Sequence, residues 1–137
     1  MKKFKIFSAL DHLDTYELNR FEKFVNSPYF NGNQGLINIC ELYISKRKKE
    51  SKDQITKDEL WESAFKGKVF SDSRLRKALS DLLKLYEDFL CQELLEKKPI
   101  QRATMLMEAL EEKNIEELYN TSIKRAKTES DENRTKN

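Results

Sequence analysis

The sequence predicts an all-α fold, and three observations support that prediction. Only 3 of the 137 residues are glycine and 2 are proline, whereas the turns of a sandwich or a barrel consume both. Apolar residues recur with a helical period along the chain. Charged residues, at 36%, nearly equal the hydrophobic 38%. We therefore expect a compact multi-helix domain over 1–126, built around one long central helix at about 72–97 and carrying a C-terminal helical hairpin.

The first expected elements are two helices separated by a short loop. One helix covers about 4–11, and Asp14 with Glu17 three residues later predicts a capping box for the next. Pro28 ends that second helix near residue 26, because the residue before a proline avoids helical geometry. The corner that follows bears two aromatic rings, which we expect to fill the core between the helices on either side: Tyr29 and Phe30.

Three more helices are expected before the hairpin. After a helix at about 33–48, Thr56 and Glu59 predict a second capping box, and Gly67 can supply the left-handed residue that ends the short helix they open. Ser71 then caps the long helix. Its apolar residues occupy several lines around the circumference, so several neighbouring helices must cover it. These apolar residues are Leu75, Ala78, Leu79, Leu82, Leu83, Leu85, Tyr86, Phe89, Leu90 and Leu94.

Pro99 breaks the helical pattern, and a hairpin is expected after it. Its first arm covers about 100–112, and Asn114 with Glu117 predicts the start of the second arm. No apolar residue occurs from 127 to 137, so we expect that segment to be a disordered polar tail.

Composition excludes several classes of protein. No stretch approaches the ~18–20 apolar residues of a membrane-spanning helix, and the basic start of the chain turns polar before a signal-peptide core develops. One histidine and two scattered cysteines, Cys40 and Cys91, offer no metal-ligand spacing. We expect both thiols to be reduced and buried, the protein to be cytoplasmic, and no cofactor, metal or membrane partner.

Enzyme chemistry lacks a sequence signal. His12 lies between two carboxylates, Asp11 and Asp14, which could orient a base, but no motif ties a nucleophile to it. The glycines are isolated, so no phosphate-binding loop is formed. The sequence therefore predicts a non-enzymatic protein without an evident small-molecule substrate.

A nucleic-acid site is the alternative that the sequence leaves open. Residues 56–85 have the outline of a helix-turn-helix, and they resemble the helices of winged-helix transcriptional activators. The resemblance ends inside the second helix, which continues where a winged-helix protein has the β-hairpin called the wing. Five basic residues would contact DNA in this hypothesis of a DNA-binding regulator: Lys66, Lys68, Arg74, Arg76 and Lys77.

Charge is unevenly distributed although the chain carries only +2 in total. Residues 1–86 hold 17 basic and 12 acidic side chains, whereas residues 87–137 hold 9 basic and 12 acidic. The basic part could meet an acidic surface, or the acidic part of another copy, although we favour unselected surface charge as the explanation of the asymmetry.

One segment carries a family resemblance. Residues 17–31, Glu-Leu-Asn-Arg-Phe-Glu-Lys-Phe-Val-Asn-Ser-Pro-Tyr-Phe-Asn, resemble the opening motif of a family of uncharacterised bacterial proteins. In that family a short helix, a Leu-rich long helix and further helical pairs follow. The resemblance implies an N-terminal helical module, in a chain that is a short member or a fragment. It implies no activity, cofactor or catalytic residue.

The leading hypothesis is a helical protein–protein interaction module, with a protein partner or self-association. Wide apolar faces, no chemical motif and a last hairpin without a successor to pack on support it. Methionine side chains adapt to irregular contacts. The candidate contact residues all lie in the hairpin: Met105, Met107, Leu110, Leu118 and Tyr119.

Overall fold

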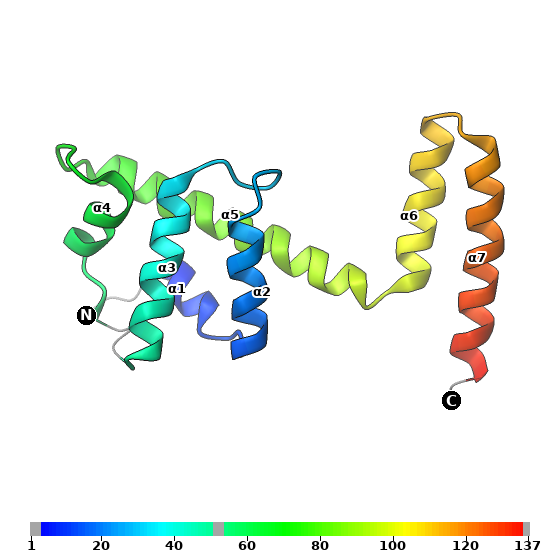
Figure 1. Ribbon diagram of the computed structural model, residues 1–137, viewed down its shortest axis with the longest axis horizontal. Helices are drawn as coiled ribbons and strands as arrows, with labels where there is room; N and C mark the ends of the chain where they lie inside the picture. Colours follow the sequence, from blue (N-terminus) through cyan, green and yellow to red (C-terminus); the bar gives the residue numbers. More distant parts are fainter. Residues whose placement is uncertain (1–3, 51–53, 136–137) are drawn as a thin grey trace. The chain divides into compact units, whose positions relative to one another are not determined.

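The computed structural model describes residues 4–50 and 54–135, with side chains described as far as residue 129. These residues form seven α-helices and no strand, which confirms the predicted all-α fold (Figure 1). The helices are α1 Lys5–Leu10, α2 Thr15–Val25, α3 Gln34–Lys48, α4 Lys57–Phe65, α5 Asp72–Glu96, α6 Pro99–Glu112 and α7 Glu116–Thr135.

The chain divides into two compact units, Met1–Phe89 and Leu90–Asn137, in place of the single domain expected over 1–126. The boundary falls inside α5, and the burial of that helix explains it. Its buried residues all come before the boundary: Leu75, Ala78, Leu82, Leu85, Tyr86 and Phe89. Leu90 and Leu94, which the apolar pattern also assigned to the core, are 41% and 55% exposed. The N-terminal unit thus covers α5 only as far as Phe89.

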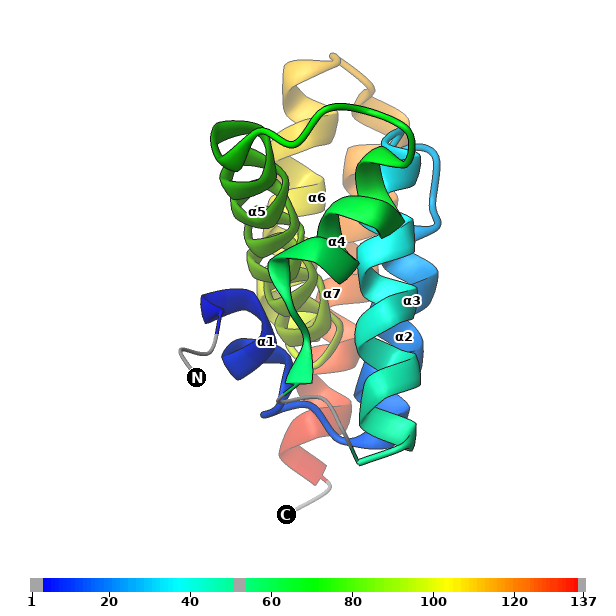
Figure 2. The same ribbon diagram turned by 90° about the vertical axis from the view of Figure 1, so that its left-hand side faces the viewer.

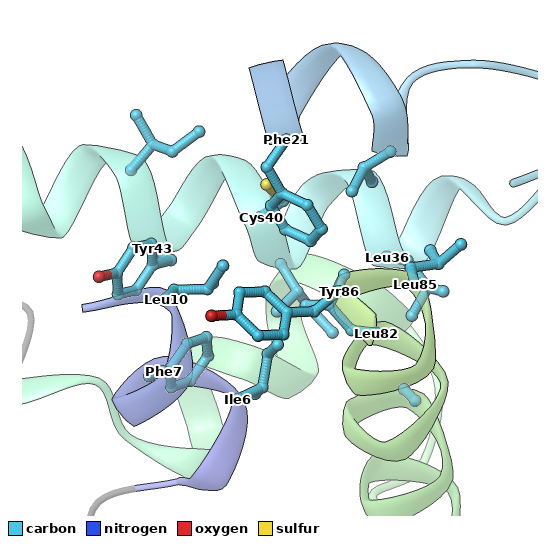
Figure 3. Close-up of a cluster of buried hydrophobic side chains, with 14 of the residues drawn as sticks. Ile6, Phe7, Leu10, Phe21, Leu36, Cys40, Tyr43, Leu82, Leu85 and Tyr86 are labelled. Carbon is cyan, nitrogen blue, oxygen red and sulfur yellow. The ribbon is translucent and has the colours of Figure 1, made fainter. Parts of the chain in front are cut away.

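The core of the N-terminal unit lies where α1, α2 and α3 meet the first part of α5. Figure 3 shows Phe21, Tyr43 and Tyr86 converging in this core with aliphatic side chains from α1 and α5. The ring of Phe21 contacts those of Tyr86 and Phe89 edge to face, at centroid distances of 5.9 and 5.3 Å. Figure 2 shows α2 and α4 beside α3, in agreement with the contacts between these helices.

Local signals set several helix boundaries as predicted. The Glu17 amide donates to Asp14 Oδ1 over 2.8 Å, and the Asp14 amide donates to Glu17 Oε1 over 3.0 Å, so the first capping box is complete. At Thr56 only half of the second box forms. The Glu59 amide donates to Thr56 Oγ1, but Glu59 Oε1 accepts from Lys46 Nζ over 3.1 Å and does not return to the cap. The Glu59 carboxylate therefore pairs with a cation from α3 and not with the cap amide.

The aromatic corner after α2 differs from the prediction. Tyr29 is 91% exposed and Phe30 is 43% exposed, so these rings do not fill the core. Phe30 instead lies over Phe24, with ring centroids 4.4 Å apart. The short corner that Pro28 begins turns both rings outward.

Asn31 is the residue that this corner buries, and it is only 8% exposed. Its Nδ2 donates to the backbone oxygens of Val25, over 2.9 Å, and Asn33, over 3.2 Å. Its Oδ1 accepts from the Asn33 amide over 3.0 Å. One amide side chain therefore satisfies a carbonyl at the end of α2 and joins it to the segment that starts α3.

The short helix α1 is held by side chains from helices far away in the sequence. Arg47 Nη1 donates to the Leu10 oxygen over 3.1 Å, and its Nη2 donates to the Leu13 oxygen over 2.6 Å. Tyr86 Oη donates to the Ala9 oxygen over 3.0 Å. A positive charge at the C-terminal end of a helix also opposes the negative end of its dipole.

The hairpin of the C-terminal unit turns at Asn114, which has a left-handed φ of 56°. The Asn114 amide donates to the Glu111 oxygen and the Ile115 amide to the Leu110 oxygen, both over 3.0 Å. This is the hydrogen-bond pattern of a Schellman motif, so Asn114 ends α6 and does not cap α7 as the sequence suggested.

The polar tail expected over 127–137 is corrected as well. Helix α7 continues to Thr135, so residues 127–135 are helical, and 136–137 lie outside the described residues. Lack of apolar residues predicted disorder, but this segment contains no glycine or proline. Extending an existing helix adds a hydrogen bond per residue without a new nucleus, which favours its continuation.

Truncation of the core should destabilise the N-terminal unit. Leu82 is fully buried, so Leu82→Ala should lower the free energy of unfolding by about 2–5 kcal/mol. Urea unfolding followed by the fluorescence of the single tryptophan, Trp61, reports on this unit. The matched control is Val69→Ala at a 92% exposed position, which should change it by less than about 0.5 kcal/mol. Similar losses in both variants would contradict the assigned core.

Asn31→Ala should also be destabilising, by about 1–3 kcal/mol, since it leaves a buried carbonyl of α2 without its donor. Asn26→Ala provides the control, because the Asn26 amide makes a comparable bond to the Glu22 oxygen at an exposed position. Water can replace that bond. In the same urea experiment, Asn31→Ala should lower the free energy of unfolding more than Asn26→Ala does. The opposite order would argue against a structural role for Asn31.

Candidate protein-contact surfaces

The C-terminal unit leaves much of its apolar surface uncovered. Helix α6 contains no buried residue, and among the described side chains of α7 only Ser122 is buried. Two helices alone bury one stripe of each, and wider apolar faces stay in contact with water. The large exposed hydrophobic residues of this unit are Leu90, Leu94, Ile100, Met105, Ile115 and Leu118.

An apolar groove lies between the last turns of α5 and the first turns of α6. This open groove has a volume of about 540 Å³ within Leu90–Asn137, and Leu94 and Met105, each 55% exposed, are among the residues that line it. Its lining also includes Cys91, Leu95, Lys98 and Gln101. Leucine and methionine at such exposure cost free energy in water and favour a protein contact.

A second recess lies at the turn of the hairpin. It measures about 350 Å³, and the predicted contact residues Leu110 and Tyr119 line it together with Ile115. Glu111 and Glu116 border the same recess, so its rim is acidic.

The five predicted contact residues therefore do not form one surface. Met105 lines the groove, whereas Leu110 and Tyr119 line the recess at the turn, and Leu118 is exposed without lining either. Met107 is partly buried and lies about 200° around α6 from Met105, so the two methionines face different sides.

Sequence reasoning missed Leu94 and Cys91 as surface residues. Their apolar character was visible, but periodicity alone does not distinguish a covered helix face from a bare one. The signal for Met105 was stronger, because it falls outside the main apolar face of its own helix.

A polar cleft separates the two arms at the end away from the turn. Arg102 and Arg125 line it together with Glu96 and Glu129, in a volume of about 190 Å³. The buried hydroxyl residue Ser122 lies at its base. This cleft is narrower and more charged than the groove, so it fits an apolar partner less well.

The predicted helix-turn-helix outline is present as α4, a turn and α5. Gly67 has a left-handed φ of 82° in the turn, as expected. Trp61 Nε1 donates to the Lys68 oxygen over 2.8 Å, which fixes the turn to the core. The side chains of Lys66, Lys68 and Arg74 are exposed.

Carboxylates neutralise part of this basic surface. Asp72 bonds to Lys57 over 3.0 Å and to Arg76 over 2.7 Å, and these hydrogen bonds lower the pKa of its carboxyl. Lys77 pairs with Asp81 over 3.0 Å. Arg76 and Lys77 therefore already have anionic partners, which a DNA phosphate would have to displace.

Asp11, which precedes His12, is bound to a residue of α3. The Asp11 carboxylate accepts a hydrogen bond from Tyr43 Oη over 2.5 Å. Burial and this bond hold the pKa of the Tyr43 phenol above its usual range, so the phenol stays a donor. Throughout residues 4–50 and 54–135, no group of three or more His, Cys, Asp or Glu could hold a metal ion. No helix in those residues is long and apolar enough to cross a membrane.

Comparison with protein-family models, with curated proteins and with solved structures finds no match to this chain. The resemblance of residues 17–31 to a bacterial family therefore stays a prediction.

The two cysteines should differ sharply in reactivity. Cys91 is exposed in the groove, whereas Cys40 is buried, contrary to our expectation that both are buried. Burial, reinforced by Glu22 and Glu41, raises the pKa of the Cys40 thiol to about 12, so almost no thiolate exists at neutral pH. Iodoacetamide should thus add one label, at Cys91, as measured by mass spectrometry.

Cys91→Ser is the control and should take up no label until urea unfolds the protein. Equal labelling of both cysteines in the folded wild type would contradict the burial of Cys40.

Proposed function

We propose that this chain is a non-enzymatic helical module for protein–protein contact, and that the apolar groove is its main contact surface. The observation that carries the proposal is the exposure of Leu94 and Met105 side by side in one groove of about 540 Å³. Large apolar side chains gathered in a concave surface are typical of sites that receive an apolar side chain or helix from a partner.

The chemistry of the groove favours a partner with an amphipathic helix. Leu94, Leu95 and Met105 supply its apolar surface, and Lys98 and Gln101 also line it. These two polar side chains can pair with an acidic or amide side chain beside the apolar anchors of the partner. The reduced thiols Cys40 and Cys91 support a cytoplasmic location for this contact.

DNA binding is less well supported than protein contact. The helix-turn-helix outline supports it, with exposed Lys66, Lys68 and Arg74. However, Arg76 and Lys77 are paired with carboxylates, and Asp72 adds negative charge at the start of the second helix. A phosphate backbone would meet both signs of charge there.

Site-specific photo-crosslinking in cells tests the proposed contact surface. A benzoylphenylalanine in place of Met105 should give discrete protein adducts on irradiation, because the ring would lie inside the contact. The matched control replaces Glu62, an exposed residue of α4 in the N-terminal unit. It should give few adducts or none.

Adding Leu94→Lys to the Met105 derivative should then remove most of the adducts, since a charge in the groove would have to be desolvated on binding. Equal adduct yields from positions 62 and 105 would argue against the groove as the contact surface.

A further inference from the structure

The charged residues of the α6–α7 hairpin fall into blocks of opposite sign. Residues 108–117, at the turn, hold five glutamates and one lysine, a net charge of −4. At the other end, 96–102 together with 124–129 hold six basic and two acidic side chains, a net charge of +4. Residues 103–107 and 118–123 carry no charge. We name these parts the acidic tip, the basic end and the uncharged middle.

Part of this arrangement is unfavourable for a single hairpin. The glutamates of α6 lie near its C-terminal end and its basic residues near its N-terminal end, and both placements oppose the helix dipole. Because the arms are antiparallel, like charges of the two arms also meet at each end. Within residues 96–129, whose side chains are described, no salt bridge joins one arm to the other. In α7 the charges agree with the helix dipole, since Glu116 and Glu117 lie in its first turn, so the unfavourable contributions are those of α6 and of the like charges that meet at each end.

In the uncharged middle, each arm carries apolar residues beside the strip along which the two arms contact each other. We call this contact strip the seam. In α6, Leu106 and Ala103 line the cleft toward α7, while Ile100 and Met107 recur seven residues apart on a flank of that seam. In α7, Tyr119 and Ile123 recur four residues apart. Ile100 is exposed, and the others on these flanks are partly exposed.

We propose that a second copy of this chain packs against this hairpin in antiparallel orientation. A two-fold axis through the uncharged middle then places the acidic tip of each copy on the basic end of the other. The flanks that carry Ile100, Met107, Tyr119 and Ile123 are covered, and the four arms make a four-helix bundle. Arms of 14 residues, like α6, are about 21 Å long, which is sufficient for such a bundle.

This inference rests on the proposed function, since it names a partner for the same unit. It involves a different face, because Met107 and Met105 lie on different sides of α6. The groove at Met105 remains open in the dimer for a further protein.

Light scattering of the full chain after gel filtration gives the first test. At concentrations of ~10–100 μM we expect a mass near twice 16.3 kDa. A monomer throughout this range would overturn the dimer. It would leave the proposed groove contact standing if the Met105 derivative still forms adducts with other proteins.

A charge exchange tests the antiparallel orientation. The variant Lys124→Glu/Arg125→Glu reduces the net charge of the basic end from +4 to zero, and the variant Glu111→Lys/Glu112→Lys reduces that of the acidic tip from −4 to zero. Alone, each variant removes the attraction between opposite net charges at both ends of its dimer, so its dissociation constant should rise at least about tenfold. In the mixed dimer of an equimolar mixture, one end keeps the wild-type charges and at the other end the new glutamates meet the new lysines, so the mixture should recover the wild-type mass to within about threefold in affinity.

Circular dichroism of each variant shows that loss of the dimer is not loss of the helices. Recovery in the mixture is itself evidence that both variants are folded. If both variants dimerise as tightly as the wild type, or if the mixture stays monomeric, the antiparallel arrangement is wrong.

Discussion

The burial of α5 ends at Phe89, and most of what distinguishes this protein follows from that limit. Up to Phe89 the helix is covered by α1–α4 in a core that includes Phe21 and Tyr86. Beyond it, Leu90 and Leu94 continue the same apolar pattern without cover from the described residues. The same helix is thus buried over most of its length and exposed at its end. Exposed apolar side chains of this size are stabilised when another surface covers them.

The fold was predictable where local chemistry sets the structure. Asp14 and Glu17 form their capping box whatever the rest of the chain does, and Pro99 takes the first position of α6, where its missing amide costs nothing. Predictions failed where contacts between residues far apart in the sequence determine the local structure. Glu59 bonds to Lys46 of α3, and in the corner after α2 Asn31 is buried whereas Tyr29 is exposed. Neither outcome follows from spacing along one helix, because both depend on which surfaces meet.

The candidate site was predictable in part for the same reason. Met105 could be found because it lies off the apolar face of its own helix, which is a local property. Leu94 could not, because its position in the apolar pattern is equivalent to that of a core residue. Net charge misled in a similar way. The whole chain carries +2, but the hairpin holds blocks of −4 and +4. The total does not show where these blocks lie along the two arms, and their positions determine which surfaces attract each other.

The anchoring of α1 has a consequence for the order of folding. This helix has six residues, too few to persist alone in water, and its end is tied to Arg47 and Tyr86. During synthesis α1 leaves the ribosome well before α5, so its bond to Tyr86 forms only after that residue has emerged. Helices α2 and α3 can pair earlier, because their partners are close in sequence. The segment made before the other helices of this unit therefore gains its full set of contacts only when α5 has been made, and the burial of its apolar face, Ile6, Phe7 and Leu10, is incomplete until then.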